Sequence, residues 1–142
     1  MSRPAHVLLV EDNPGDARLA QEALRETSAL IDLAWVSDGE AALDYLYRRN
    51  DHADARRPDI VLLDLNLPRR DGREVLEVVK SDADLCSIPV LILTTSANEQ
   101  DVTSCYDRHA NCYLIKPLDL DDFTSLMHQI HSFWLTVVRL PQ

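Results

Sequence analysis

The stretch DIVLLDLNLPRRDG, residues 59–72, decides the fold class. Four aliphatic residues at 60–63 run directly into Asp64, and Asn66, a proline, two arginines and an Asp-Gly pair follow. A short, continuous apolar run bounded by turn residues is typical of a strand that is covered on both faces. We therefore expect a buried parallel strand that carries Asp64 to the edge of a sheet.

Similar apolar runs recur along the chain and alternate with segments of helical periodicity. This alternation predicts βαβ units with right-handed crossovers, and hence an α/β fold with a doubly wound, five-stranded parallel sheet and helices on both faces. Asn13 before Pro14 fits a helix start, and Ser37 with Glu40, like Ser96 with Glu99, fits a capping box. The strands are expected at 6–10, 31–36, 60–64, 89–94 and 111–115.

Composition limits the classes of protein and partner. The 142 residues suit a single domain, here 1–142, and no apolar run approaches the roughly 18 residues that span a bilayer. A formal charge of −10 disfavours nucleic acid as a partner, because phosphates are bound by clustered Lys and Arg. Three cysteines without a CxxC pair argue against a disulfide framework. We expect a cytoplasmic protein with no membrane and no nucleic-acid partner.

Polar residues follow four of the predicted strands. Each has a structural explanation of its own: a carboxylate caps helices or solvates loops, threonine is a common strand residue, and a lysine before a proline is an ordinary loop cation. Ligands of doubly wound sheets, however, bind beyond the carboxyl ends of the strands, so these residues are expected to converge there. They are Glu11, Asp12, Asp64, Thr94 and Lys116.

This set of groups predicts phosphoryl chemistry. Carboxylate oxygens without a His or Cys partner suit Mg²⁺, with Mn²⁺ as an alternative ion. Lys116 supplies a positive charge for a phosphoryl oxygen, and Asp64 is placed to act as an in-line nucleophile that becomes an aspartyl phosphate. With only three glycines, neither a GxGxxG turn nor a GxxxxGK[ST] phosphate loop can be assembled.

The chain resembles the receiver domain of two-component response regulators, which has a flavodoxin-like fold. The resemblance rests on the motifs LLVEDNPGDARL, DIVLLDLNLPRRDG, PVLILTTSAN and NCYLIKP, and it covers about residues 5–130. It implies that Asp64 accepts a phosphoryl group from a sensor histidine kinase. It also implies Mg²⁺ ligands from Asp12, Asp64 and the backbone carbonyl of Asn66, with Glu11 acting through water.

The resemblance assigns further roles by position. Thr94 and Lys116 match the groups that contact the phosphoryl oxygens, and Tyr113 matches the aromatic residue that follows the movement of Thr94. The bond from Lys116 to Pro117 is expected to be cis. Asn66 and Ser96 fall at the two positions that tune the rate of phosphoryl loss.

The chain departs from the family pattern in one turn and at its end. His109 stands where receivers usually have glycine, which is unfavourable if that turn requires a positive φ. YDRHANCYLIKPLDLDDF and the final HSFWLTVVRLPQ are similar to the stand-alone response regulators associated with bacterial phytochromes, which implies a phytochrome-type kinase and an unidentified downstream protein. Residues 131–142 are expected to extend the last helix and either form a homodimer contact or fold onto their own domain; the candidate contact residues are Phe133, Trp134, Leu135 and Leu140.

Two other functions compete with this interpretation. The segment IVLLDLN also resembles aspartate-nucleophile phosphohydrolases of the haloacid dehalogenase type, but those enzymes need a second Asp where this chain has Asn66. Asn66 cannot exchange a proton as a general acid, which disfavours a hydrolase. A receiver-like binding module without phosphorylation is the second alternative, and the complete set of acids, hydroxyl and lysine argues against it.

Overall fold

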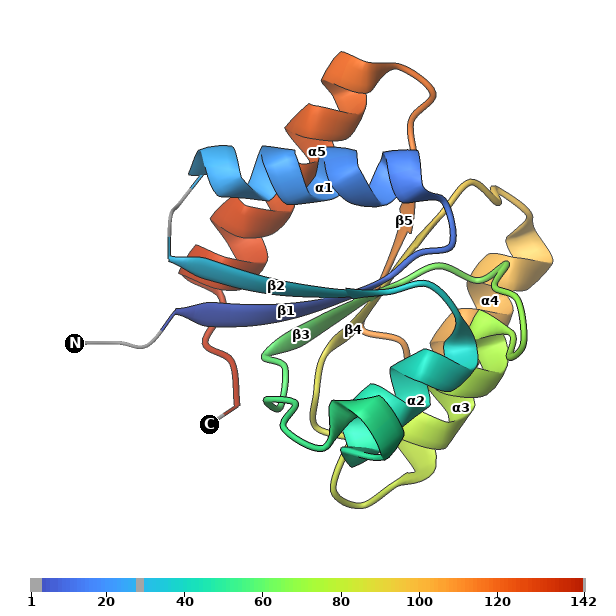
Figure 1. The fold of residues 1–142 in the computed structure, drawn as a ribbon. Helices are drawn as coiled ribbons and strands as arrows, with labels where there is room; N and C mark the ends of the chain where they lie inside the picture. Colours follow the sequence, from blue (N-terminus) through green and yellow to red (C-terminus); the bar gives the residue numbers. More distant parts are fainter. Residues whose placement is uncertain (1–3, 28–29, 142) are drawn as a thin grey trace.

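The computed structural model describes residues 4–27 and 30–141. Strands and helices alternate as the sequence predicts, and a short 3-10 turn, Asn50–His52, interrupts the connection before the third strand (Figure 1). The strands are β1 (Ala5–Val10), β2 (Ile31–Val36), β3 (Ile60–Leu63), β4 (Val90–Thr94) and β5 (Cys112–Ile115). The helices are α1 (Pro14–Thr27), α2 (Gly39–Tyr47), α3 (Gly72–Ser81), α4 (Glu99–Asp107) and α5 (Leu120–Ser132).

All five strands form one parallel sheet in the order β2-β1-β3-β4-β5. The order reverses direction between β1 and β3, which is where doubly wound sheets open a crevice at their carboxyl edge. β1 lies in register with both neighbours, because Val10 pairs with Val36 of β2 and with Leu63 of β3. The carboxyl ends of these central strands therefore finish at the same level.

Helices cover both faces of the sheet, with α1 and α5 on one side and α2, α3 and α4 on the other (Figure 1). Strand residues alternate between the two cores: Val7 and Leu9 pack with the helices α1 and α5, whereas Leu8 and Val10 pack with α2 and α3. Both sets are almost fully buried, which explains why the strands read as continuous apolar runs rather than as an alternating pattern. The predicted fold class is confirmed.

Helix α1 begins at Pro14 as predicted, but both capping boxes are wrong. The N-cap of α2 is Asp38, whose carboxylate accepts from the backbone N–H of Ala41 at 2.7 Å, and not Ser37. The N-cap of α4 is Asn98, whose side chain accepts from the N–H of Gln100 at 2.7 Å. In both loops an Asp or Asn stands nearer the helix than the serine does, and these residues cap at least as well as serine.

The chain after α5 is not a continuation of the α-helix. α5 ends at Ser132, and a π-helical turn, Phe133–Val137, follows and closes with the N–H of Val138 donating to the carbonyl of Phe133 at 2.8 Å. The turn and the residues after it pack apolar side chains of the tail against the core that the sheet forms with α1 and α5, and burial of that surface is the physical reason for the departure. The tail residues packed there are Trp134, Leu135 and Leu140; Gln142 lies outside the described residues.

The turn between α4 and β5 requires the left-handed backbone conformation. His109 has a φ of 70°, and its N–H donates to the carbonyl of Tyr106 at 2.9 Å. The next N–H, of Ala110, donates to the carbonyl of Cys105 at 3.0 Å, which closes the helix end. A Cβ in this conformation costs roughly 1–2 kcal/mol, so the absence of glycine here leaves the turn strained.

Replacing His109 with glycine is expected to raise the free energy of unfolding by about 1 kcal/mol, because the strain of the Cβ exceeds the extra backbone entropy of glycine in the unfolded chain. Chemical denaturation checks this value. His109→Ala is the matched control, since it removes the imidazole but keeps the Cβ, and it should not stabilise the protein. Equal gains from both variants would show that the imidazole, and not the φ angle, destabilises the turn.

Within the described residues, no helix has both the length and the apolar character needed to cross a membrane.

Candidate functional site

Four strands deliver polar side chains to one edge of the sheet. Glu11 follows β1, Asp64 follows β3, Thr94 ends β4 and Lys116 follows β5. Backbone bonds continue the sheet into this layer: the N–H of Asp64 donates to the carbonyl of Val10 at 3.1 Å. The N–H of Lys116 likewise donates to the carbonyl of Thr94 at 2.7 Å. The convergence follows from strands that are parallel and end together, which is why a sequence pattern could predict it.

Three carboxylates form a cluster that suits a cation. Glu11, Asp12 and Asp64 each offer an oxygen, and these oxygens lie within 4.8 Å of one another. Glu11 and Asp64 are buried, whereas Asp12 is exposed and leaves the cluster open to solvent. The cluster contains only oxygen donors, which is the ligand chemistry of Mg²⁺ and Mn²⁺. The residues present therefore fit a divalent ion of this class.

Lys116 is the counter-charge of this cluster. Its ammonium contacts Glu11 Oε1 and donates to Asp64 Oδ2 at 3.1 Å and to Asp16 Oδ2 at 3.2 Å. Burial raises the pKa of Glu11 to about 7 in spite of the contact with Lys116. Burial alone would lower the pKa of Lys116, but its hydrogen bonds and its attraction to Glu11 and Asp64 outweigh burial and raise that pKa. The lysine is thus held as a cation in the site.

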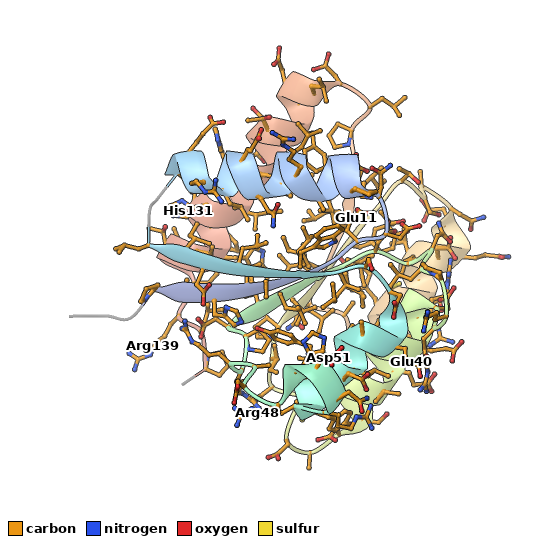
Figure 2. All side chains as sticks on the ribbon, in the orientation of Figure 1. Glu11, Glu40, Arg48, Asp51, His131 and Arg139 are labelled. Carbon is orange, nitrogen blue, oxygen red and sulfur yellow. The ribbon has the colours of Figure 1, made fainter. Side chains whose placement is uncertain are left out.

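Two partners of the cluster were not predicted from the sequence. Asp16, in the first turn of α1, contacts Lys116. Its position four residues after Asp12 was the feature of the sequence that could have indicated this contact. Trp35 of β2 donates its indole N–H to the carbonyl of Glu11 at 2.7 Å, and so fixes the backbone between Glu11 and Asp12. Figure 2 shows Glu11 beside the start of α1, at the opposite end of the sheet from His131 and Arg139.

The loop that carries Asp64 is packed against the start of α3. Asp64 Oδ1 accepts from the N–H of Leu65 at 2.7 Å, and the carbonyl of Leu65 accepts from the N–H of Gly72 at 2.8 Å. A Cβ on Gly72 would lie 2.1 Å from the carbonyl oxygen of Asp64, so no other residue fits there. Asn66 lies in this loop and is exposed, and its backbone nitrogen lies 3.4 Å from Asp64 Oδ1.

The predicted switch residues lie on the β4–β5 side of the site. Thr94 is fully buried, and its Oγ1 lies 3.5 Å from the N–H of Ser96. The hydroxyl of Tyr113 donates to the carbonyl of Ser96 at 2.9 Å, which ties β5 to the loop after β4. The hydroxyl of Ser96 donates to Asp101 at 2.6 Å. Thr94, Ser96 and Tyr113 thus form one connected group.

The expected cis bond before Pro117 is wrong in this structure. No peptide bond in residues 4–27 and 30–141 is cis, and the Lys116–Pro117 bond is therefore trans. The two isomers of an X–Pro bond differ by only about 0.5–1 kcal/mol, so the sequence itself decides weakly between them.

Known proteins resemble the chain along nearly its whole length. The response regulator receiver domain family model matches residues 7–128. Response regulator Rcp1 of Synechocystis sp. is 46% identical over 138 residues, which is 97% of this chain and 94% of Rcp1. A crystal structure of the Mn²⁺-bound form of Rcp1 matches with a TM-score of 0.94 at 46% identity and covers 98% of this chain and 100% of that one. A crystal structure of the phosphorylated cyanobacterial phytochrome response regulator RcpA gives a TM-score of 0.95 at 45% identity and covers 99% and 100%.

Proposed function

The chain belongs to the response regulator receiver domain family, and from this membership we propose that Asp64 accepts a phosphoryl group from a sensor histidine kinase. The observation that carries the proposal is the placement of the Asp64 carboxylate beside the Glu11–Asp12 pair and in contact with the ammonium of Lys116. The family works by phosphorylation-dependent signalling, and this site has each group that such a transfer needs.

The transfer proceeds in one displacement. A carboxylate oxygen of Asp64 attacks the phosphorus of a phosphohistidine, the P–N bond breaks, and its electron pair returns to the imidazole, which takes up a proton. Lys116 contacts the carboxylate before transfer and is placed to bind a phosphoryl oxygen afterwards. The hydroxyl of Thr94 is proposed as a second donor to the phosphoryl group, and Tyr113 as the residue that follows its movement.

We assign Mg²⁺ to the carboxylate cluster. Asp12, Asp64 and the backbone carbonyl of Asn66 would hold it, and Glu11 would act through water. The bound ion would neutralise negative charge on the phosphoryl oxygens. The Mn²⁺-bound structure of the similar protein Rcp1 supports a divalent ion here, with Mn²⁺ as the alternative.

The chain's own residues also govern the loss of the phosphoryl group. Asn66 and Ser96 are proposed to tune this step, by helping or hindering the attacking water. Asn66 offers an amide and no titratable carboxyl, so it cannot serve as the general acid and base of a hydrolase. A phosphorylated signalling state is therefore favoured over turnover of an external phosphate ester.

The experiment that tests this function uses a small-molecule phosphodonor. Incubation with acetyl phosphate and Mg²⁺ is expected to add one acid-stable, base-labile phosphoryl group, measured by intact mass, and a chelator should prevent it. An unmodified mass under these conditions would contradict the assignment and leave a phosphorylation-free binding module. Release of phosphate from p-nitrophenyl phosphate over many turnovers would instead favour the hydrolase.

Replacing Asp12 with asparagine is expected to stabilise the metal-free protein by about 1 kcal/mol and to weaken Mg²⁺ binding more than tenfold. The change removes one of three mutually repelling carboxylates, and it removes a proposed ligand. Thermal unfolding with and without Mg²⁺ measures both effects, because an ion that binds only the folded state raises its stability. Glu40→Gln, at an exposed carboxylate in the first turn of α2, is the control. Equal Mg²⁺ stabilisation of the wild type and Asp12→Asn would exclude Asp12 as a ligand.

We further propose that the kinase is of the phytochrome type, since the similar protein RcpA is a phytochrome response regulator. The protein would act in the cytoplasm and contact a downstream protein whose chemistry is still to be identified. Nucleic acid is not among the proposed partners, because the charge of −10 repels phosphates.

The tail is a proposed homodimer contact. Trp134, Leu135 and Leu140 are partly buried against their own core, which leaves Phe133, 54% exposed, and Val137, 71% exposed, as the apolar side chains that a second copy could cover.

Phe133→Asp is therefore expected to shift the protein toward monomer in sedimentation velocity, since a carboxylate would have to be desolvated in the contact. Thr136→Asp adds the same charge at an exposed position of the same turn without removing apolar surface, and it should act more weakly. An unchanged oligomeric state in Phe133→Asp would remove this residue from any dimer contact.

A further inference from the structure

Arg73, the second residue of α3, joins α3 to α4. Its Nη1 donates to both carboxylate oxygens of Asp71, each at 3.1 Å, and its Nη2 donates to Asp101 Oδ1 at 2.8 Å. The side chains of Arg73 and Asp101 are only 27% and 25% exposed. Charge-assisted bonds of a half-buried guanidinium are stronger than those of exposed ion pairs, so this contact restrains the two helices relative to each other.

The second oxygen of Asp101 holds the loop after β4. Asp101 Oδ2 accepts from the hydroxyl of Ser96 at 2.6 Å, and the same hydroxyl oxygen lies 3.3 Å from the N–H of Asn98. The carbonyl of Ser96 in turn accepts from the hydroxyl of Tyr113 at 2.9 Å. Arg73, Asp101 and Ser96, which we call the Arg73 clasp, therefore fix the acceptor that receives the Tyr113 hydroxyl.

The clasp begins beside the backbone of Asp64. Gly72 immediately precedes Arg73, and the position of its missing Cβ lies 2.1 Å from the Asp64 carbonyl oxygen and 2.7 Å from the Cα of Leu65. The first turn of α3 is thus in direct contact with the loop that carries Asp64. A displacement of that loop would move Arg73, because packed backbones cannot interpenetrate.

We propose that Arg73 and Asp101 are positioning residues that couple the backbone at Asp64 to the orientation of Tyr113 by way of Ser96. This route runs through α3 and α4 and is distinct from the one through Thr94. While the clasp is closed, the Ser96 carbonyl is held where Tyr113 can bond to it. When the clasp opens, Tyr113 loses its partner and its ring becomes hydrated. The signalling role of the clasp rests on phosphorylation of Asp64, whereas its effect on Tyr113 does not.

The test measures Tyr113 in the full chain without any phosphodonor. Fluorine NMR of protein labelled with 3-fluorotyrosine follows each of the four tyrosines, and Tyr113→Phe identifies the resonance of interest.

Burial raises the pKa of Tyr113, and the nearby charge of Arg73 opposes this rise. Loss of the cation alone would therefore raise the pKa of Tyr113 further. Opening of the clasp lets water reach the phenol, which acts on that pKa in the opposite direction, so the solvent isotope shift is the deciding measurement. Arg73→Gln is expected to increase the solvent isotope shift of the Tyr113 resonance; an unchanged isotope shift would overturn the proposal.

Matched variants separate the clasp from a general loss of charge. Arg70→Gln removes an arginine that pairs with Glu74 on the exposed side of the same region, and Glu99→Gln removes an exposed carboxylate in the first turn of α4. Neither is expected to move the Tyr113 resonance. Asp101→Asn should reproduce Arg73→Gln, and the double variant should exceed either single change only slightly, because both break one connection. Additive effects would show that the two residues act separately and would refute the clasp.

The signalling part is tested by phosphorylation. Acetyl phosphate and Mg²⁺ are expected to shift the Tyr113 resonance of the wild type, and Arg73→Gln should reduce this shift several-fold at an equal phosphoryl content measured by intact mass. An undiminished shift would exclude the coupling. A wild type that takes up no phosphoryl group would refute the proposed function, and the measurement without phosphodonor would still decide whether the clasp positions Tyr113.

Discussion

Asp64→Asn is expected to abolish incorporation of the phosphoryl group. The amide keeps nearly the shape of the carboxylate and can still accept from the N–H of Leu65, but its oxygen carries no negative charge and is a poor nucleophile. The fold should survive, because the Lys116 ammonium keeps its contacts with Glu11 and Asp16. The loss of reactivity would therefore be chemical rather than structural.

Intact mass after incubation with acetyl phosphate and Mg²⁺ measures the effect, and circular dichroism confirms the fold. Asp51→Asn is the matched control, since Asp51 is an exposed carboxylate in the turn after α2, remote from Glu11 (Figure 2). It should be modified as fully as the wild type. Continued labelling of Asp64→Asn, or a phosphoryl group mapped to another residue of the wild type, would remove Asp64 from its proposed role.

Much of the site could be predicted from the sequence because topology alone creates it. Parallel strands end at one edge, so the residues after them meet whatever the details of packing. The strand at 31–36 matches the structure residue for residue, and Asp64 lies one residue beyond the end of β3. Burial of both faces of the sheet explains the unbroken apolar runs on which the prediction depended.

The partners on helices could not be predicted in the same way. Asp16 and Asp101 reach the site or its loop only because their helices have a particular rotation about their axes, and strand periodicity carries no information on that rotation. The sequence does not indicate which of the three arginines in PRRDGR, residues 68–73, forms a structural contact. Long-range contacts, such as that from Arg73 to Asp101, distinguish them.

Local preference also failed where two conformations are nearly equal in energy. The bond before Pro117 is trans, and the helix caps fall on Asp38 and Asn98 instead of on the serines nearby. In each case the alternatives differ by about 1 kcal/mol or less, so the packing of the surrounding loop decides. The backbone conformation of His109, in contrast, could be predicted. Receivers usually have glycine at this position, which indicates a turn with a positive φ that strains any other residue.

Gly72→Ala is expected to lower the free energy of unfolding by about 3 kcal/mol and to slow phosphorylation several-fold. In an unobstructed helix the change would be favourable, since alanine is the better helix former by about 1 kcal/mol. Here the new methyl group would lie 2.1 Å from the carbonyl oxygen of Asp64 and 2.7 Å from the Cα of Leu65. Both contacts are with backbone, which cannot rotate away, so the loop that bears Asp64 must shift.

Gly15→Ala is the matched control, because Gly15 is also in the first turn of its helix, α1. A Cβ there would meet only Asn13 Oδ1 at 3.2 Å, an exposed side-chain oxygen that accepts from the N–H of Asp16 at 3.1 Å and has to shift only slightly. Gly15→Ala should leave stability unchanged or slightly increased and phosphorylation unaffected. Urea denaturation and the rate of labelling by acetyl phosphate measure the two effects. If Gly72→Ala were as stable as Gly15→Ala, the loop that bears Asp64 would adjust to the new methyl group at no cost. The packing of α3 on this loop could not then transmit a movement of the loop to α3.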